Sequence, residues 1–519
     1  MELEADLVVF NGKVTTMNPE NPEATAMAVK NYKFLVVGSD EDVIDLVGTA
    51  KRVIDLGGKA VVPGFIDAHT HITYAGMRSS HIDFGSARSI EEVKKMLRDA
   101  LPRYAPGEWI RGYNWDESKW KEDRYITAKD LDEVSTEHPI AIDRVDLHLT
   151  SANTLALEEF DLPKDSEGVM TDKEGKPTGV LKDIVGLFGE GEPGGMNLQD
   201  AVCAATSLAN RHGITTAVDN IQSGFLKAIR DCERKELLTA RLVVNPRVEN
   251  LEHMIALGIT SGLGGPMVRI GGVKLFTDGS IGARTAAVSE PYTDDKKNTG
   301  KMFISEEELQ EIYRKAIDHG IQTLTHAIGD AAIETVLNAF ESLAEEQREK
   351  IRLQRHRIEH AEMISEYQIR RAVSLGLILS MQPNFVGQWQ LEGGLYEKRF
   401  GEERVRGMNM FRVALDNGAR VAFGSDGMPY GPLYGIWSAT THPNPRVRLT
   451  IEEALRCYTL EAAYSSYMER IAGSIQVGKR ADFVVLSENI LECEPDKIKD
   501  VRVESTFVGG IEEYSAVKE

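Results

Sequence analysis

Two histidines lie one residue apart in residues 65–71, which read FIDAHTH. Side chains at positions i and i+2 of a β-strand point to the same side of the strand. Asp67, His69 and His71 would therefore share one face, where two imidazoles can bind a metal ion. The pair alone is weak evidence, because a His-X-His motif also arises by chance.

The elements around this segment predict a barrel of parallel strands. Apolar, β-branched runs alternate with amphipathic helical runs, and several of the helical runs close with glycine, a helix C-terminal signal. Eight strands with intervening helices predict an α/β protein with a (β/α)8 TIM barrel. A doubly wound sheet is the alternative, but it requires a glycine-rich phosphate loop that FIDAHTHI lacks. The expected strands cover residues 61–71, 214–219, 241–246, 269–276, 321–326, 356–360, 377–382 and 420–425.

Residues able to bind a metal end several of these strands. Active sites of barrel enzymes lie at the C-terminal ends of the strands. Each residue alone has an ordinary explanation, such as a hydrogen-bonded core histidine or an aspartate that caps a turn. Their shared position at one end of successive strands predicts a divalent metal centre. The candidates are His69, His71, Lys274, His326, His360 and Asp426.

Lys274 needs a separate explanation, because a protonated ammonium group repels a metal ion. It lies in the apolar run IGGVKLF, where a lysine is costly unless it is paired or neutral. A neutral amine can react with carbon dioxide, and the carbamate is an anionic ligand able to bridge two metals. The alternative is a lysine that binds substrate or lies at the surface.

The two chain ends resemble each other, since residues 5–14 read ADLVVFNGKV and residues 481–490 read ADFVVLSENI. We expect both ends to form one composite β-sandwich domain, 1–60 plus 473–519, and the barrel to comprise 61–74 plus 198–472. Residues 75–197 far exceed an ordinary strand-to-helix loop. They are expected to form an inserted subdomain over the barrel mouth that supplies the substrate pocket.

Composition excludes several classes of partner. The net charge of -21 argues against a nucleic acid or an anionic membrane as partner. No run of about 18 apolar residues predicts a membrane helix, and the first residues lack the features of a signal peptide, so a cytoplasmic location is expected. The four cysteines are far apart, which argues against a disulfide scaffold and a cysteine-built zinc site.

Taken together, the motifs resemble those of the amidohydrolase superfamily, and within it the YtcJ-like branch that includes N-substituted formamide deformylases. The resemblance spans essentially the whole chain and rests on VVPGFIDAHTHI, GITTAVD, VKLFTDGSIGART, THAIGDAAIE, RIEHAE, FGSDGMP and SIQVGKRADFVVL. It implies one or two divalent metal ions, with zinc expected. His69, His71 and Asp426 would bind the more buried ion, and His326 and His360 the second.

Lys274, carboxylated, would bridge the two ions in this resemblance. The implied reaction is hydrolysis of a carbon–nitrogen amide-type bond in an N-acyl or N-formyl compound. A catalytic zinc lowers the pKa of bound water to about 7, so hydroxide would be available at neutral pH to attack the carbonyl. Asp426 would accept the proton and pass it to the leaving nitrogen. The residues expected to bind substrate are Trp115, Asp116, Trp120, His148, Asn153, Asp278 and Arg284. The alternatives are that the tryptophans pack in a core, that the other insertion residues cap a helix or lie at the surface, and that Asp278 and Arg284 orient Lys274.

Two alternative functions follow from the same pattern. Deaminases on this barrel resemble one another in a glutamate shortly after the strand-five histidine, where this chain has Gly329-Asp330. A non-catalytic regulatory or interaction protein would be expected to lack metal ligands, and every candidate ligand is present here. The expected partner is a small-molecule substrate, and the resemblance allows a homodimer.

Overall fold

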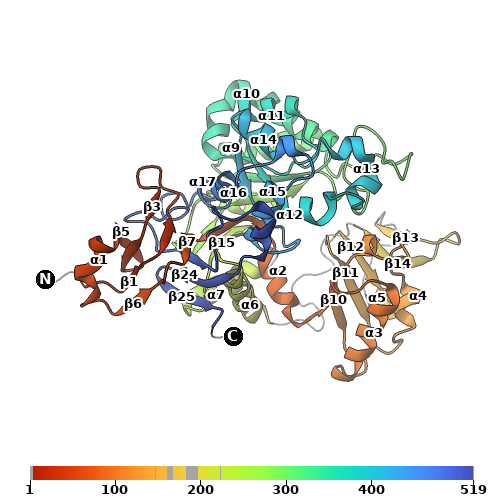
Figure 1. Cartoon of the computed structure of the whole chain (residues 1–519). Helices are drawn as coiled ribbons and strands as arrows, with labels where there is room; N and C mark the ends of the chain where they lie inside the picture. The colour runs from red at the N-terminus through yellow and green to blue at the C-terminus, as the bar shows by residue number, and fades with distance from the viewer. Residues whose placement is uncertain (1–3, 147, 160–167, 183–196, 223, 518–519) are drawn as a thin grey trace.

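The computed structural model describes residues 4–146, 148–159, 168–182, 197–222 and 224–517, and within these ranges the strands form five sheets (Figure 1). Two sheets are built of parallel strands, and they carry the candidate metal ligands. The first has the order β17-β16-β15-β8 and the second the order β18-β19-β20-β21-β22. Their bounds are β8 (Phe65–Thr70), β15 (Ile214–Asn220), β16 (Arg241–Asn245), β17 (Val268–Ile270), β18 (Gly272–Phe276), β19 (Gln322–Ala327), β20 (Arg357–His360), β21 (Ile378–Met381) and β22 (Arg420–Phe423).

The two parallel sheets adjoin each other without closing into one hydrogen-bonded sheet. Gly271 alone separates β17 from β18, so the strand expected over 269–276 leaves one sheet and enters the other. A Cβ atom on Gly271 would lie 2.1 Å from the side-chain oxygen of Asn245, which explains the glycine. At the opposite edges, the Asp426 N–H donates to the His69 carbonyl at 2.8 Å. The predicted α/β class is confirmed, whereas the predicted closed TIM barrel is not.

Helices cover the outer faces of these sheets and bury apolar side chains in two main cores, one against each sheet. Side-chain caps define several helix starts: Ser305 and Glu308 form a capping box at α9, and Ser365 and Gln368 form one at α11. The bounds are α6 (Leu198–Arg211), α7 (Phe225–Arg234), α8 (Leu251–Ala256), α9 (Glu306–Asp318), α10 (Asp330–Gln354), α11 (Glu366–Leu375), α12 (Pro383–Phe385), α13 (Leu395–Val405), α14 (Phe411–Asp416), α15 (Pro432–Thr440), α16 (Ile451–Cys457) and α17 (Leu460–Ser465).

Strands from both chain ends pair in one sheet of order β25-β24-β23-β7-β2-β3, and a second sheet has the order β5-β4-β1-β6. The strand expected over 61–71 is divided at Gly64, because β7 pairs with β23 while β8 begins the parallel sheet. The limits of the three expected domains stay a prediction. The bounds are β1 (Leu7–Phe10), β2 (Lys13–Thr15), β3 (Glu23–Ala24), β4 (Ala26–Lys30), β5 (Lys33–Gly38), α1 (Asp40–Val47), β6 (Arg52–Asp55), β7 (Ala60–Pro63), β23 (Phe483–Leu486), β24 (Val503–Val508) and β25 (Ile511–Ser515).

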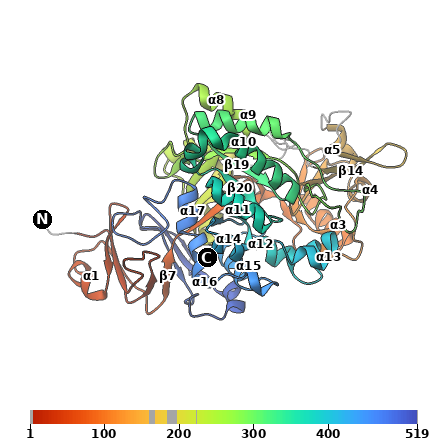
Figure 2. The same cartoon turned by 90° about the horizontal axis from the view of Figure 1, so that it is seen from above.

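The long segment after β8 and α2 (Ile72–Met77) builds its own six-stranded sheet, of order β13-β14-β12-β11-β10-β9. This inserted sheet lies beside α13 in both views (Figures 1 and 2), where the Lys398 ammonium donates to the Ser118 carbonyl at 3.3 Å. Parts of the predicted insertion, 160–167 and 183–196, lie outside the described residues. The bounds are β9 (Ile82–Asp83), α3 (Ile90–Ala100), β10 (Ile110–Trp115), α4 (Ala128–Asp132), β11 (Ile140–Arg144), β12 (Leu149–Ala152), α5 (Thr154–Glu159), β13 (Val169–Thr171) and β14 (Pro177–Lys182).

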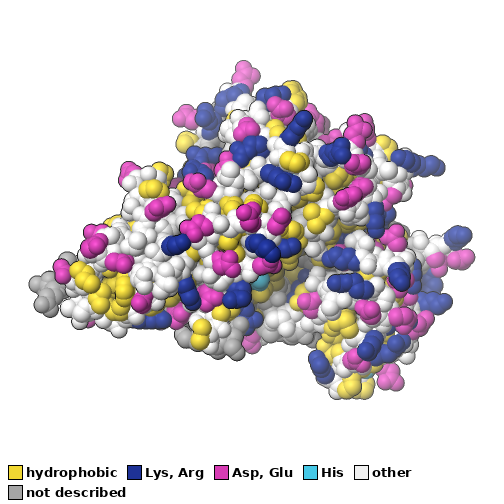
Figure 3. Space-filling view, viewed as in Figure 1, with side chains coloured by type: hydrophobic (Ala, Val, Ile, Leu, Met, Phe, Trp, Pro, Cys, Tyr) yellow, Lys and Arg dark blue, Asp and Glu magenta, His cyan; other side chains and the backbone are white. Residues whose placement is uncertain are grey.

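The outer surface mixes charges of both signs. Figure 3 shows lysine and arginine side chains interspersed with aspartate and glutamate over the visible face. In the part of the chain that the structure describes, no helix is both long and apolar enough to cross a membrane.

Candidate metal centre

The C-terminal ends of five parallel strands bring the candidate ligands into one buried cluster. His69 lies in β8, and His71 follows directly and begins α2. Lys274 lies within β18, and Asp426 comes shortly after β22. The two remaining histidines are His326 in β19 and His360 at the end of β20.

Two imidazoles and one carboxylate form the tightest part of the cluster. The Nε2 atoms of His69 and His71 lie 3.8 and 3.5 Å from Oδ1 of Asp426. The nearest possible ligand atoms of these three residues all lie within 4.8 Å of one another, which is close enough to share one ion. Among the described residues, they therefore form a three-ligand group with nitrogen and oxygen donors.

Hydrogen bonds on the far side of each ring orient these two histidines. Nδ1 of His71 donates to the Asn220 carbonyl at 3.1 Å, and Nδ1 of His69 bonds to the Glu359 carboxylate. Because each Nδ1 carries the proton, each Nε2 keeps its lone pair and faces Asp426. This is the arrangement by which proteins hold a ligating histidine in one tautomer.

The other candidates lie beside this group. Nζ of Lys274 lies 3.2 Å from Nε2 of His69. The ring centroids of His326 and His360 are 4.4 Å apart, and His360 lies 4.8 Å from His69. Nε2 of His326 donates to the Gly279 carbonyl at 3.1 Å. The structure thus brings together all six residues predicted to hold metal.

Burial sets the protonation of the cluster. It lowers the pKa of the His71 imidazole to about 3, and the pKa values of His69, His326 and His360 fall in the same direction for the same reason. These imidazoles are therefore neutral at pH 7, as metal ligation requires. Burial also lowers the pKa of Lys274 to about 8.

The polar atoms of the cluster fit a divalent cation. Oδ1 of Asp426 and Nδ1 of His360 are buried without a hydrogen-bond partner in the part of the chain that the structure describes. Such atoms are costly unless something binds them. Both residues also hold left-handed backbone angles, with φ of 52° and 70°, which non-glycine residues adopt mostly at functional sites.

Glu359 is a functional partner that was not among the predicted site residues. Its carboxylate accepts from Nδ1 of His69 and from Nε of Arg357, at 2.7 Å for the arginine. The signal was present in the run RIEH, where Arg357 and Glu359 are two residues apart and both charged in a buried strand. The hydrogen bond between Glu359 and His69 could not be predicted from this run, because His69 is far away in sequence.

A cavity of about 510 Å³ opens onto the cluster, and residues of the inserted sheet form part of its wall. His71, Lys274, His326, His360 and Asp426 lie at its floor, on the side of the strand ends. The inserted sheet contributes Asp143, Asp146, His148, Leu149, Thr150 and Leu181. The place of the insertion over the strand ends therefore agrees with a role in forming the pocket.

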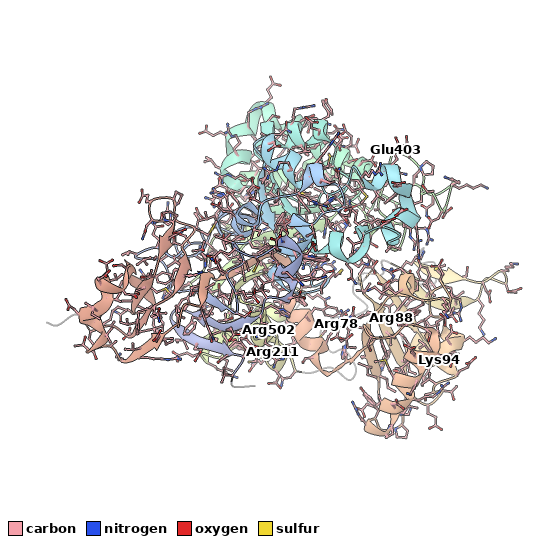
Figure 4. All side chains as sticks on the ribbon, in the orientation of Figure 1. Arg78, Arg88, Lys94, Arg211, Glu403 and Arg502 are labelled. Carbon is pink, nitrogen blue, oxygen red and sulfur yellow. The ribbon has the colours of Figure 1, made fainter. Side chains whose placement is uncertain are left out.

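One residue at the edge of the insertion joins it to the body. Arg78, labelled in Figure 4, follows α2, and its guanidinium donates to the Asp143 carboxylate at 2.8 Å. Its charge also lies 4.1 Å above the ring of Tyr74. These contacts hold the inserted sheet against the helix that begins at His71.

Two of the predicted substrate residues, His148 and Asp278, lie near the cluster or the cavity wall, and Arg284 does not. His148 lines the cavity, and its ring centroid is 5.7 Å from that of His326. Asp278 is fully buried, and its carboxylate accepts from the N–H groups of Ile328 and Gly329, so it holds the loop after β19. Arg284 pairs with the Asp294 carboxylate at 2.9 Å and does not line the described cavity.

The other four predicted substrate residues lie inside the insertion, away from the cavity. The indole N–H groups of Trp115 and Trp120 donate to the carbonyls of Ile142 and Ala87, and both rings pack in the core of the inserted sheet. Two polar residues hold loops and turns: Asp116 caps a short helix, and the Asn153 side chain bonds to four backbone groups.

This parallel α/β scaffold, with buried histidines, a lysine and an aspartate at its strand ends, is that of a metal-dependent hydrolase. Residues 52–512 match the amidohydrolase family, and the chain belongs to this family. It is 30% identical to Protein LONG AFTER FAR-RED 3 of Arabidopsis thaliana over 98% of this chain and 92% of that protein.

Two further likenesses agree with this assignment. The chain is 27% identical to N-substituted formamide deformylase of Arthrobacter pascens over 98% of each chain, and 27% identical to the putative amidohydrolase YtcJ of Bacillus subtilis over 96% of this chain and 97% of that one. An uncharacterized metal-dependent hydrolase from Pyrococcus horikoshii has a similar structure, with a TM-score of 0.75 and 26% identity, over 94% of this chain and 99% of that one. The predicted resemblance to the YtcJ-like branch is thus confirmed.

Proposed function

We propose that this protein is a metal-dependent amidohydrolase that cleaves a carbon–nitrogen amide-type bond in an N-acyl or N-formyl compound. The observation that carries the proposal is the convergence of two neutral imidazoles on Oδ1 of Asp426 at the floor of a cavity. Likeness to a protein named N-substituted formamide deformylase supports the choice of bond.

His69, His71 and Asp426 would hold one divalent cation, and His326 and His360 a second. A bound cation supplies Lewis acidity, which lowers the pKa of water and polarises a carbonyl oxygen. Asp426 moves the proton. Burial raises its pKa to about 7, so near neutral pH its carboxylate can take a proton from water and return it to the leaving nitrogen.

Lys274 is proposed to carry a carbamate. Because burial lowers its pKa to about 8, about a tenth of the amine is neutral at pH 7, far more than for an ordinary lysine. The nitrogen lone pair of Nζ forms a bond to the carbon of carbon dioxide, and a proton leaves to water. The product is an anionic group beside His69, suited to bridging two cations.

The first test measures metal content by inductively coupled plasma mass spectrometry after zinc loading. We expect wild type to hold one or two ions per chain. The His71→Ala variant should lose most of the ion held with Asp426, because one of three ligands is removed. The matched control is His253→Ala, which removes an exposed histidine. The metal content of this variant should equal that of wild type.

Activity then decides the reaction class. N-formyl and N-acyl amines should be hydrolysed by wild type and by His253→Ala, and at least 100-fold more slowly by His71→Ala. Wild type that retains metal but hydrolyses none of these compounds would contradict the proposed bond. A chain that binds no metal would favour the non-catalytic alternative. Zinc as the natural ion, a cytoplasmic location and a homodimer stay predictions.

A further inference from the structure

One arginine in the cavity wall forms no ion pair with the residues that the structure describes. Arg247 follows β16, and its half-buried side chain lines the same cavity as the metal cluster. Its guanidinium carbon lies 5.1 Å above the ring centroid of Phe276. Within the described ranges, its side chain makes no hydrogen bond and no ion pair with a protein group.

Several buried arginines of this protein are paired with carboxylates. Arg357 binds the Glu359 carboxylate at 2.7 Å, and Arg241 binds the Asp482 carboxylate at 2.7 Å. Arg144 lies within 4.0 Å of three carboxylates. A partly desolvated guanidinium is costly without an anion, so an unpaired one that faces a cavity indicates a missing ligand group.

Four carboxylates line the cavity besides that of Asp426 in the metal cluster, and none of the four forms an ion pair with Arg247 among the described residues. Asp143 accepts from Arg78, and Asp146 pairs with Arg144 at 2.7 Å. Glu308 caps α9 through the Ser305 N–H at 2.8 Å. Glu249 is exposed and forms no ion pair with Arg247 among the described residues, although its more distant charge opposes the lowering of the Arg247 pKa by burial. In the part of the chain that the structure describes, the Arg247 guanidinium is therefore available to an anion that enters the cavity.

The backbone holds Arg247 beside the metal cluster. The Lys274 N–H donates to the Pro246 carbonyl at 2.9 Å, and Arg247 and Lys274 form a parallel bridge. Nζ of Lys274 lies 5.0 Å from the Phe276 ring that Arg247 also covers. Arg247 and Lys274 thus contact the same phenyl ring. A small molecule whose anionic group binds Arg247 can therefore also reach the metal cluster.

We propose that the substrate carries a carboxylate and that Arg247 binds it while the amide group lies at the metal cluster. This rests on the proposed hydrolase function and narrows the substrate class to acidic amides. A carboxylate fits because a guanidinium donates two parallel hydrogen bonds to it. A phosphate dianion would call for further donors, and the other cation in the wall, Lys274, faces His69.

Binding tests the site without turnover. Zinc-loaded protein is titrated by calorimetry with 3-phenylpropanoate and with neutral 3-phenylpropan-1-ol, which have no hydrolysable bond. Wild type should bind the anion roughly 10- to 100-fold more tightly than the alcohol, the range of a charged hydrogen-bonded pair. Arg247→Gln should lose this preference. Arg247→Lys keeps the positive charge but cannot donate two parallel hydrogen bonds, so it should retain part of the preference.

The matched control is Arg98→Gln, which removes an exposed arginine of α3 and should keep the wild-type preference. Equal affinity of wild type for anion and alcohol would overturn the proposal. So would a preference that survives in Arg247→Gln, because the carboxylate would then bind elsewhere, as on the metal. If Arg247→Gln does not fold, added salt decides: it should weaken only the anion in wild type.

Turnover separates this proposal from the proposed function. N-formylphenylalanine should have a kcat/KM at least 10-fold above that of its carboxamide in wild type, and this ratio should collapse in Arg247→Gln. Anion binding through Arg247 without hydrolysis of either compound would contradict the proposed function alone. Hydrolysis of both compounds at equal kcat/KM in wild type would contradict only the proposal that Arg247 binds a substrate carboxylate.

Discussion

At the scale of residues, several histidines are buried in this protein and must stay neutral. The cluster histidines are held so by burial and by bonds on one ring nitrogen. His356 shows the same principle outside the cluster. Its Nδ1 accepts from the Thr323 N–H at 3.1 Å, and its Nε2 donates to Oε1 of Gln354 at 3.1 Å. A proton on Nδ1 would face an N–H group.

His356 predicts a specific sensitivity to acid. Burial lowers its pKa to about 3, whereas the unfolded chain binds this proton near pH 6.5. Between these values the unfolded state holds more protons, so stability falls as pH falls. We expect the free energy of unfolding of wild type to drop relative to His356→Gln by about 1 kcal/mol per pH unit from pH 6 to pH 4. Urea unfolding at each pH measures the difference.

A matched variant isolates this effect. His253→Gln removes an exposed histidine, and its difference from wild type should stay constant over the same pH range. A constant difference for His356→Gln as well would show that His356 takes up its proton equally in the folded and unfolded chain.

At the scale of elements, the site depends on an edge where two strands meet without a ladder of hydrogen bonds. β8 and β22 belong to different sheets, yet His69 and Asp426 come from them. The Asp67 carboxylate accepts from the Ser425 N–H at 2.9 Å and joins the two strands. A Cβ atom on Gly424 would lie 2.4 Å from the backbone nitrogen of His69, so only glycine permits this approach.

Gly424→Ala should therefore separate β8 from β22. We expect it to lower the free energy of unfolding by about 1–3 kcal/mol, because added atoms in a packed interior force backbone shifts, and to reduce metal content. Gly48→Ala is the control, since a Cβ atom there meets nothing within 4 Å and its backbone is helical. Thermal unfolding and metal analysis of both variants measure the outcome; equal behaviour would mean that β8 and β22 can separate without cost.

At the scale of the whole molecule, parts distant in sequence are joined by buried ion pairs. Arg241 in β16 binds Asp482, just before β23, through two bonds of 2.7 Å. Asp482 also accepts from the Gly509 N–H at 2.7 Å. One carboxylate thus ties a parallel sheet to the sheet that contains both chain ends.

Asp482→Asn leaves the Arg241 guanidinium buried without its counter-charge. We expect a loss of about 3–5 kcal/mol in the free energy of unfolding, the cost of breaking a buried pair from one side. Glu492→Gln breaks the exposed pair of Lys13 and Glu492, which also joins the two chain ends, and should leave the urea midpoint unchanged. Similar midpoints for both variants would show that the buried pair does not hold the sheets together.

Local sequence patterns determined the strands and the residue types that end them. All eight expected strand positions are occupied by strands, and the six predicted ligands lie together. Both could be predicted because the two-residue period of a strand and the types of the residues that end it are visible in short stretches of sequence. Only the tertiary structure decided that 61–71 divides at Gly64, that the parallel strands form two sheets, and that His69 meets Glu359. These depend on contacts between residues far apart in the chain, 290 positions for that hydrogen bond, which no local period encodes.

The same reason separates the pocket residues. Tryptophan and asparagine are residue types that suit a binding site. In the structure, however, Trp115, Trp120 and Asn153 are buried inside the inserted subdomain. Arg247 belonged to no motif, and it became a candidate only when the structure placed it on the cavity wall without an ion pair to any described residue. Sequence determined which chemistry the strand ends can perform, and packing between distant segments decided which further side chains face the substrate.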